Sequence, residues 1–248
     1  MLTGIKDTDF IILSKLNDRD LLSACQVNRE AFRLCRDENF WRNRFISRYG
    51  REDFEMLKDK IQMSWRKFML LLIKYLDLGK EDYNKAMKYS AKEGQKELID
   101  FFILKGADYW EWGMLFASEG GHQKLVDFFI SKGANVWNWG MQGAAKGGHR
   151  KLIDFFIKKG ANNWNMGMEG AAKGGHRELV DFFILKGAKD WNWGMKYASQ
   201  GGHKNLVDFF ISKGANDWDW GMRGAKQGGH KELIEFFKNK LKNILIFN

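Results

Sequence analysis

Five histidines recur at one fixed spacing, and histidine is the side chain that most readily binds metals or transfers protons near neutral pH. His122, His149, His176, His203 and His230 each follow the previous one by 27 residues. One histidine per unit places neighbours about 10 Å apart, the spacing of packed helices, whereas zinc ligands lie about 2 Å from one ion. The spacing therefore predicts a structural role, capping the second helix of each unit or bridging turns between units, and no metal site.

Tryptophan and aspartate recur with the same period. The tryptophans are Trp110, Trp112, Trp137, Trp139, Trp164, Trp191, Trp193, Trp218 and Trp220. Aromatic side chains with basic neighbours can stack nucleic-acid bases, but these recur in phase with the apolar residues, so we expect them to fill the space between successive units. The aspartates Asp127, Asp154, Asp181 and Asp208 have no nucleophile or second carboxylate beside them. We therefore predict no catalytic residues, no cofactor and no enzymatic activity.

The elements that position these residues follow from the repeat itself. Six units share the period between residues 83 and 237, and one of them, residues 137–163, reads WNWGMQGAAKGGHRKLIDFFIKKGANN. It predicts two short antiparallel helices, over 138–146 and 149–159. Gly147 and Gly148 would supply the positive φ angles of the turn, and Gly160 would close the second helix. Leu152, Ile153, Phe155, Phe156 and Ile157 predict a second helix that is apolar almost all round and buried between its neighbours.

This unit resembles the ankyrin repeat. The resemblance rests on Ala-Ala-x-x-Gly-His, on the Leu-Ile/Val pair followed by bulky apolar residues, and on Lys-Gly-Ala. The usual ankyrin unit has about 33 residues, and the residues missing here lie before Met141, where ankyrin proteins project a β-hairpin finger. The predicted fold is therefore all-α: an N-terminal three-helix module, then an ankyrin-like solenoid of six 27-residue hairpins without fingers. We expect the last residues, LKNILIFN, to fold back over the final hairpin.

Sequence variation between the units indicates where recognition would occur. The position after the constant methionine reads Lys88, Leu115, Gln142, Glu169, Lys196 and Arg223, and four residues later it reads Lys92, Glu119, Lys146, Lys173, Gln200 and Gln227. Positions four apart share one face of a helix, so these residues form one stripe along the first helices. In ankyrin-like stacks those helices line the concave surface. We predict that this inner-helix stripe binds a target protein, and the alternative is an unconstrained solvated surface.

Residues 1–50 lack the repeat period and predict three helices, the second capped by Asp18 or Asp20. They resemble an F-box, the three-helix module that docks onto the Skp1 adaptor of cullin-RING ubiquitin ligases. The resemblance is carried by Ile12-Leu13-x-x-Leu16, Asp20-Leu21-Leu22, Cys25-x-Val27-Asn28, Leu34-Cys35 and Phe40-Trp41 with Arg44, without the usual Leu-Pro at the start. It implies that Leu13, Leu16, Leu21, Leu22, Val27 and Trp41 contact the adaptor or form the module's core, with a core role favoured for Val27 and Trp41. Residues 51–82 predict a helical linker, which leaves 83–248 for the repeats and a C-terminal cap.

Composition limits the remaining possibilities. Cys25 and Cys35 are the only cysteines, so we expect reduced, buried thiols and no disulfide scaffold. The beginning of the chain lacks the apolar run of a signal peptide, and the apolar run at 69–73 is too short to span a bilayer. The net charge of +10 comes from basic residues interspersed with acidic ones, which favours a solvated surface over a nucleic-acid site. We expect a cytoplasmic monomer that does not bind membranes.

An F-box followed by degenerate ankyrin-like units resembles proteins of giant DNA viruses that infect amoebae, which implies a role in the host cytoplasm. The sequence therefore predicts a substrate-receptor subunit of a Skp1–cullin–F-box ubiquitin ligase, whose repeats bind the target. One alternative is an ankyrin-type scaffold that sequesters a partner, its N-terminal helices being only a cap. A further alternative is a nucleic-acid binder that uses the basic, tryptophan-bearing stack.

Overall fold

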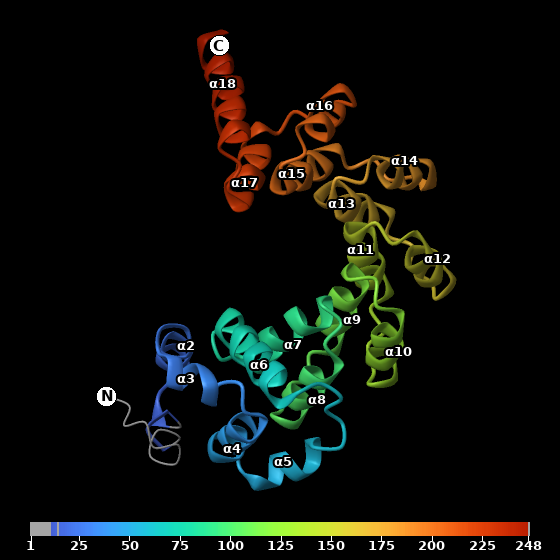
Figure 1. The fold of residues 1–248 in the computed structure, drawn as a ribbon. Helices are drawn as coiled ribbons and strands as arrows, with labels where there is room; N and C mark the ends of the chain where they lie inside the picture. Colours follow the sequence, from blue (N-terminus) through green and yellow to red (C-terminus); the bar gives the residue numbers. More distant parts are fainter. Residues whose placement is uncertain (1–10, 14, 248) are drawn as a thin grey trace. The chain divides into compact units, whose positions relative to one another are not determined.

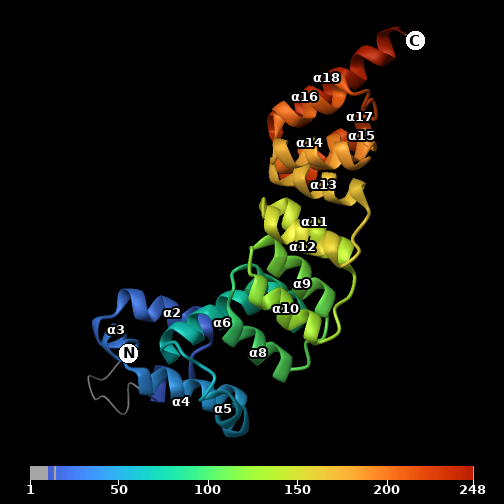
Figure 2. The same ribbon diagram turned by 90° about the vertical axis from the view of Figure 1, so that its right-hand side faces the viewer.

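The structure is a computed structural model that describes residues 11–13 and 15–247, and side chains as far as residue 242 (Figures 1 and 2). Every regular element in these residues is a helix. The chain divides into two compact units. The first unit comprises the residues up to Ser90 together with Gln95–Asp108, and the second comprises Ala91–Gly94 together with the residues from Tyr109 onward.

The first unit begins with a short helical turn at residues 11–13, and its longer helices are α2 (Asp18–Val27), α3 (Arg29–Leu34), α4 (Glu38–Tyr49), α5 (Arg51–Leu57), α6 (Trp65–Gly79), most of α7 (Tyr83–Lys92) and α8 (Lys96–Leu104). Asn17, not Asp18 or Asp20, caps α2, because its side chain accepts a hydrogen bond from the Asp20 backbone N–H. Residues 35–37 interrupt the third predicted helix, and Asp37 caps α4. The predicted linker likewise contains two helices, α5 and α6, rather than a continuous one.

Aromatic side chains form the core of the first unit. The Phe45 ring lies 5.9 Å from the Phe68 ring and 5.8 Å from the Phe101 ring, measured between centroids, and all three side chains are fully buried. The three rings come from α4, α6 and α8. The second helix of the first repeat is therefore part of the same core as the helices that precede the repeats.

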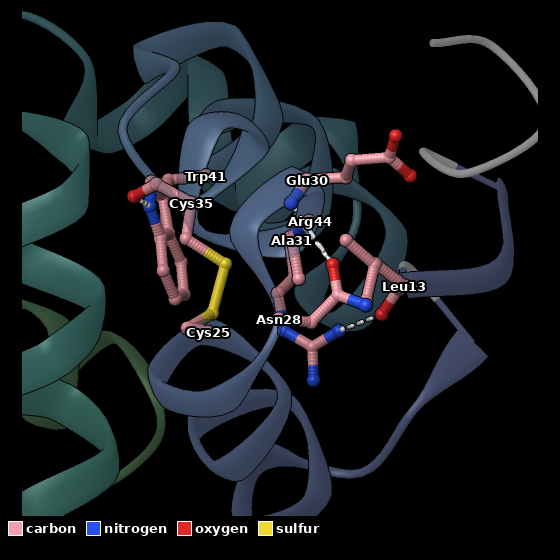
Figure 3. Close-up of a disulfide and its surroundings, with 8 residues drawn as sticks. All are labelled: Leu13, Cys25, Asn28, Glu30, Ala31, Cys35, Trp41 and Arg44. Atoms are coloured by element: carbon pink, nitrogen blue, oxygen red, sulfur yellow. Dashed lines mark hydrogen bonds between the residues drawn. A yellow bond between two sulfur atoms is a disulfide. The ribbon is translucent and has the colours of Figure 1, made fainter. Parts of the chain in front are cut away.

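The two cysteines correct the sequence-based expectation. Cys25 on α2 and Cys35 at the end of α3 form a disulfide, with their Cα atoms 6.0 Å apart (Figure 3). The prediction of reduced thiols was wrong because it treated the two residues separately. Asn28 ends α2 and caps α3 by accepting hydrogen bonds from the Glu30 and Ala31 backbone N–H groups, so that α3 folds back toward α2. This turn brings the cysteines together.

The second unit is a stack of helical hairpins. Its first helices are α9 (Trp110–Glu119), α11 (Trp137–Gly147), α13 (Trp164–Gly174), α15 (Trp191–Gly201) and α17 (Trp218–Gly228). Its second helices are α10 (Gln123–Ser131), α12 (Arg150–Lys158), α14 (Arg177–Lys186), α16 (Lys204–Ser212) and α18 (Lys231–Phe247). The predicted pair at 138–146 and 149–159 is confirmed as α11 and α12. Gly148, at φ 78°, makes the turn between them, whereas Gly147 remains in α11. Gly160, at φ 107°, follows α12 as predicted.

The first helices pack directly on one another, and each second helix packs mainly on the first helix of its own hairpin (Figure 1). Close packing of the first helices depends on glycine. A Cβ atom added at Gly143 would lie 2.2 Å from the Leu115 backbone oxygen, and one at Gly170 would lie 2.3 Å from the Gln142 backbone oxygen. These positions have no room for a side chain, so the solenoid-like arrangement of this unit requires glycine there.

The second helices are less buried than predicted. Leu152, Ile153 and Phe156 are buried, but Phe155 and Ile157 are only half-buried. In later units the first phenylalanine of the pair, which is also half-buried, is covered by a cation from the preceding unit. The Arg150 guanidinium lies 3.8 Å from the Phe182 ring centroid, and the Arg177 guanidinium lies 3.6 Å from that of Phe209. Cation–π contact, in addition to burial, therefore accounts for these half-buried rings.

The C-terminal residues also differ from the prediction. The residues expected to fold back over the last hairpin continue α18 as one helix as far as Phe247 (Figure 2). None of the described helices combines the length and the apolar character that a membrane crossing requires.

Candidate functional site

The five repeated histidines connect successive hairpins of the second unit. The Nε2–H of each ring donates a hydrogen bond to a backbone carbonyl 30 residues earlier: His122 to Lys92, His149 to Glu119, His176 to Lys146, His203 to Lys173 and His230 to Gln200, over 2.9–3.2 Å. A carbonyl oxygen can only accept, so Nε2 must carry the proton. These carbonyls lie at or near the ends of the first helices, where carbonyls lack partners within the helix. Of the two predicted roles, bridging is confirmed, and the side chains of His122, His149, His176 and His203 do not cap the helices that follow them.

An asparagine ladder was missed in the sequence. The side-chain oxygen of Asn138 accepts hydrogen bonds from the Asn162 and Asn163 backbone N–H groups, at 2.9 Å each. Asn165 and Asn192 make the same pair of contacts one and two units later. The asparagine that follows the first tryptophan of α11, α13 and α15 therefore holds the loop that starts the next unit. Its recurrence at the histidine period was a signal that could have identified this role.

The predicted inner-helix stripe lies on α7, α9, α11, α13, α15 and α17. Lys88 belongs to the first unit, and its ammonium lies 4.9 Å from the Tyr89 ring centroid. In the second unit, Leu115, Gln142, Lys146, Glu169, Lys173, Lys196 and Gln200 are half-buried, Lys92, Arg223 and Gln227 are exposed, and Glu119 is buried. The stripe is thus more buried in its middle than at its C-terminal end.

Glu119 is the centre of an ion cluster on this stripe. Its Oε1 atom lies 2.8 Å from the Lys92 Nζ and 2.8 Å from the Lys146 Nζ, and the residue is only 6% exposed. Burial alone would raise the pKa of Glu119, but the hydrogen bonds from Lys146 and Lys92 outweigh it and hold that pKa below its usual value. The Oε2 atom is buried without a hydrogen-bond partner. The two lysines therefore favour the ionised form of Glu119, whose second carboxylate oxygen accepts no hydrogen bond from the described residues.

Two units further on, a carboxylate of the same stripe behaves in the opposite way. Burial raises the pKa of Glu169 to about 7, and the negative charge of Asp190 adds to this effect. Its hydrogen-bonding partner is the neutral amide of Gln142, at 3.2 Å, which stabilises the anion less than an ammonium group does. Glu169 therefore exchanges its proton near neutral pH.

Tryptophans at the C-terminal end of the stripe surround a lysine. The Lys196 ammonium lies 4.2 Å from the Trp193 ring centroid and 4.3 Å from that of Trp220, and the two rings meet edge to face at 4.3 Å. This contact between successive hairpins agrees with the predicted role of the tryptophans as fillers. Lys196 therefore already occupies one face of each of these rings, which base stacking would require to be free.

The candidate adaptor-binding residues separate into buried and accessible groups. Leu13, Leu21 and Trp41 are buried, and Leu16 and Leu22 are half-buried. The favoured core role is confirmed for Trp41, whose Nε1–H donates to the Cys35 carbonyl oxygen at 2.8 Å. For Val27 it was wrong: this side chain is 85% exposed, because it is the last residue of α2 and precedes the turn at Asn28.

Arg44 holds the beginning of this module together. Its guanidinium donates to the Leu16 carbonyl oxygen and to the Asp18 carboxylate, both at 2.8 Å. It also donates to the Leu13 carbonyl oxygen at 3.4 Å (Figure 3). Arg44 is 5% exposed, so these bonds satisfy a buried charge. They join the residues before α2 to α4.

An apolar hollow lies beside the disulfide in the first unit. Its volume is about 440 Å³, and its lining includes Leu22, Phe32, Trp41 and Leu70 as well as both cysteines. Val27 and Phe32 are among the exposed large apolar side chains of the protein. The module therefore presents accessible apolar residues next to a hollow with apolar walls, an arrangement typical of protein-binding surfaces.

Over the described part of the chain, no three histidine, cysteine, aspartate or glutamate side chains are grouped so that they could hold a metal ion.

Comparison with known proteins identifies a relationship for the N-terminal residues alone. No curated protein matches the sequence. The F-box-like family model matches residues 10–47, the segment that contains α2, α3 and most of α4.

Proposed function

We propose that the protein is the substrate-receptor subunit of a Skp1–cullin–F-box ubiquitin ligase. In this role the N-terminal module binds a Skp1-type adaptor, and the inner-helix stripe binds the protein to be ubiquitinated. The observation that carries the proposal is the F-box-like match over residues 10–47, within which Val27 and Phe32 expose apolar surface. F-box-like domains typically bind Skp1-like adaptors, and repeated helical hairpins typically bind proteins.

The mechanism needs no active site in this chain. A receptor that holds its target in the same complex as the ligase raises the effective concentration of target lysines near the ubiquitin donor. The stripe supplies residues that vary between units on a backbone held by recurring glycines, histidines and asparagines. Variation on a constant scaffold is what a recognition surface requires, because specificity can change without changing the fold.

Retention of a Skp1-type adaptor by the immobilised full chain tests the proposal. We expect the wild-type chain to retain the adaptor and the double variant Val27→Asp, Phe32→Asp to lose at least about nine-tenths of the bound adaptor, since charges would enter an apolar contact. Leu185→Asp is the matched control, because Leu185 is 88% exposed and belongs to the other unit. Leu21 is unsuitable for this test, because it is fully buried and its substitution would unfold the module.

Failure of the wild-type chain to retain any Skp1-type adaptor would remove the ligase role. The remaining proposal would then be the scaffold that sequesters a partner through the stripe, with the N-terminal helices as a cap. The cytoplasmic location and the host-directed role implied by the resemblance to giant-virus proteins belong to the ligase proposal, because the adaptor and the cullin are cytoplasmic components of a eukaryotic host.

A further inference from the structure

The middle of the inner-helix stripe contains a hollow of about 210 Å³. Its position follows from the residue after the first stripe position, which is aromatic in some units and glycine in others: Tyr89, Phe116, Gly143, Gly170, Tyr197 and Gly224. Gly143 and Gly170 occupy this position in two successive units, and they line the hollow between Phe116 and Tyr197. The side chains of Phe116 and Tyr197 form two aromatic walls of the hollow, and α9, α11, α13 and α15 contribute its lining.

Close packing explains the two glycines, so they alone do not indicate a ligand. The charged groups that line the hollow, together with Lys92, which pairs with Glu119 beside it, do indicate one. Lys92, Lys146 and Lys173 bring three ammonium groups toward one ionised carboxylate, Glu119. Glu169, which also lines the hollow, is partly protonated near neutral pH and compensates only part of the excess. The cluster is therefore net positive.

Lys173 is the lysine of this cluster whose charge has no ion-pair partner among the residues that the structure describes. It is half-buried, and within the described residues no hydrogen bond or ion pair engages its ammonium. Burial lowers the pKa of Lys173, and the nearby Lys146 and Lys92 lower it further, while Glu119 offsets only part of this. A desolvated ammonium beside two like charges gains from an additional anion.

The hollow also contains an acceptor without a donor. Glu119 lines it, and the Oε2 atom of Glu119 is buried without a hydrogen-bond partner. A ligand that satisfies both groups carries an anion for Lys173 and an N–H donor for Glu119. An acidic residue in an extended polypeptide has both, because its carboxylate lies within a few bonds of the backbone N–H groups.

We propose that this hollow is the recognition subsite for an acidic side chain, aspartate or glutamate, of the target polypeptide. Its carboxylate pairs with Lys173 and Lys146, its methylene stem packs between Phe116 and Tyr197, and a backbone N–H of the same segment donates to Glu119 Oε2. This subsite rests on the proposed use of the stripe as the target-binding surface, and it names the chemistry of the target there. It does not depend on Skp1 binding.

Selection of short random peptides displayed on phage, with the full-length chain as bait, provides the probe. We expect the selected peptides to be enriched in aspartate or glutamate at one fixed position. One such peptide, synthesised with a fluorescent label, is then titrated with wild type, with Lys173→Met and with Lys151→Met as control, since Lys151 is exposed on α12. Fluorescence anisotropy gives the dissociation constants, and thermal denaturation checks that each variant is folded.

Lys173→Met should weaken binding about tenfold, the loss typical of a charge-assisted hydrogen bond, and Lys151→Met should leave the affinity unchanged. Replacing the acidic residue of the peptide by its amide should also weaken binding about tenfold. The affinity of the amide peptide should then be the same for wild type and for Lys173→Met, because both changes remove the same interaction. Additive losses would overturn the assignment. So would selection of peptides without a shared acidic residue, or tighter binding of the same peptide with phosphoserine in that position, which would identify a phosphate site.

Adaptor retention separates this inference from the proposed function. Lys173→Met should retain the Skp1-type adaptor as the wild type does, because Lys173 belongs to the second unit. If the chain retains the adaptor but selects no acidic peptides, the proposed subsite alone is overturned. If it selects acidic peptides but does not retain the adaptor, the ligase role is removed and the subsite remains.

Discussion

Glu119 and Glu169 both lie on the inner-helix stripe, Glu169 directly after the constant methionine of its unit and Glu119 four residues further along in its own unit. Their partners determine their charge at neutral pH. Two ammonium groups hold Glu119 as an anion despite its burial. Burial of Glu169 outweighs the nearby charge of Lys196 and the hydrogen bond from the Gln142 amide, so the pKa of Glu169 rises to about 7. At the residue scale, the partner of a buried carboxylate decides whether it stays ionised.

Glu169 should make stability depend on pH. Its folded-state pKa is raised from 4.5 to about 7, so the folded protein holds this proton more tightly than the unfolded chain. The contribution is present below pH 4.5 and is lost as the pH rises toward 7. Glu169→Gln should remove this loss, and above the raised pKa it should be more stable than wild type by about 1–2 kcal/mol after solvent screening.

Urea denaturation of both proteins across this pH range measures the difference. Glu178→Gln is the control, because Glu178 is exposed on α14. Parallel pH profiles for wild type and Glu169→Gln would contradict the assignment.

His149 tests the ladder between hairpins. His149→Ala removes the bond from Nε2–H to the Glu119 carbonyl, 3.0 Å long, and leaves that carbonyl without this partner. The free energy of unfolding should fall by about 1–3 kcal/mol. Chemical denaturation measures this loss, with Lys151→Ala as an exposed control. An unchanged midpoint for His149→Ala would show that the bond contributes no net stability.

At the element scale, the distance between first helices is set by glycine. Gly143 and Gly170 have backbone oxygens of the preceding helix where a Cβ atom would lie. Phe116 and Tyr197 occupy the same position in other units, and these two rings line one hollow together with the two glycines. The hollow is therefore a property of neighbouring helices rather than of one unit.

Gly143→Ala should therefore destabilise the stack although alanine favours helices. The added methyl group would lie 2.2 Å from the Leu115 oxygen, so α9 and α11 would have to separate. We expect a net loss of about 1–3 kcal/mol, since the strain exceeds the gain of about 1 kcal/mol in helix propensity. Thermal and urea denaturation are the measurements. Greater stability of Gly143→Ala than of wild type would refute the close approach.

The disulfide acts on α2 and α3. It closes a loop over a sequence separation of 10 residues, for which the loss of unfolded-state entropy predicts a contribution of about 2–3 kcal/mol. Addition of a reductant should lower the denaturation midpoint of the first unit by a corresponding amount. The Cys25→Ser, Cys35→Ser variant should begin at the lower midpoint and not respond to the reductant. Equal responses of the two proteins would show that the bond is not the cause.

At the scale of the whole molecule, the net charge of +10 is distributed in pairs and clusters. Arg150, Arg177 and Lys204 pair with an aspartate four residues later, and the stripe lysines surround Glu119. The basic residues therefore alternate with acidic ones instead of forming a continuous track for a phosphate backbone.

We accordingly expect only weak binding of a single-stranded oligonucleotide, with an affinity that depends little on salt. Anisotropy titrations of a labelled oligonucleotide at several salt concentrations measure the slope of log K against log[salt]. A steep slope, typical of many phosphate contacts, would instead support the nucleic-acid alternative. The acidic peptide serves as the positive control for an active preparation.

The sequence by itself determined the repeat, the helical hairpins and a structural role for the histidines, and the structure decided between capping and bridging in favour of bridging. A strict period carries this information, because residues that recur in phase must occupy equivalent positions. The F-box-like resemblance was also legible in the sequence, and the family match covers the same segment. The stripe was predicted as a set of positions, and its role in binding remains a proposal.

Only the tertiary structure decided which groups meet. The turn at Asn28 pairs Cys25 with Cys35 and exposes Val27. The close approach of first helices brings Lys92 and Lys146 to Glu119, although each belongs to a different repeat. Local pattern defines the faces of a helix, but charge, burial and pKa depend on neighbours that are distant along the chain. For this reason the sequence indicated the stripe, whereas the structure showed the hollow in its middle and the net charge there. The ligand that we propose for the hollow rests on these two observations.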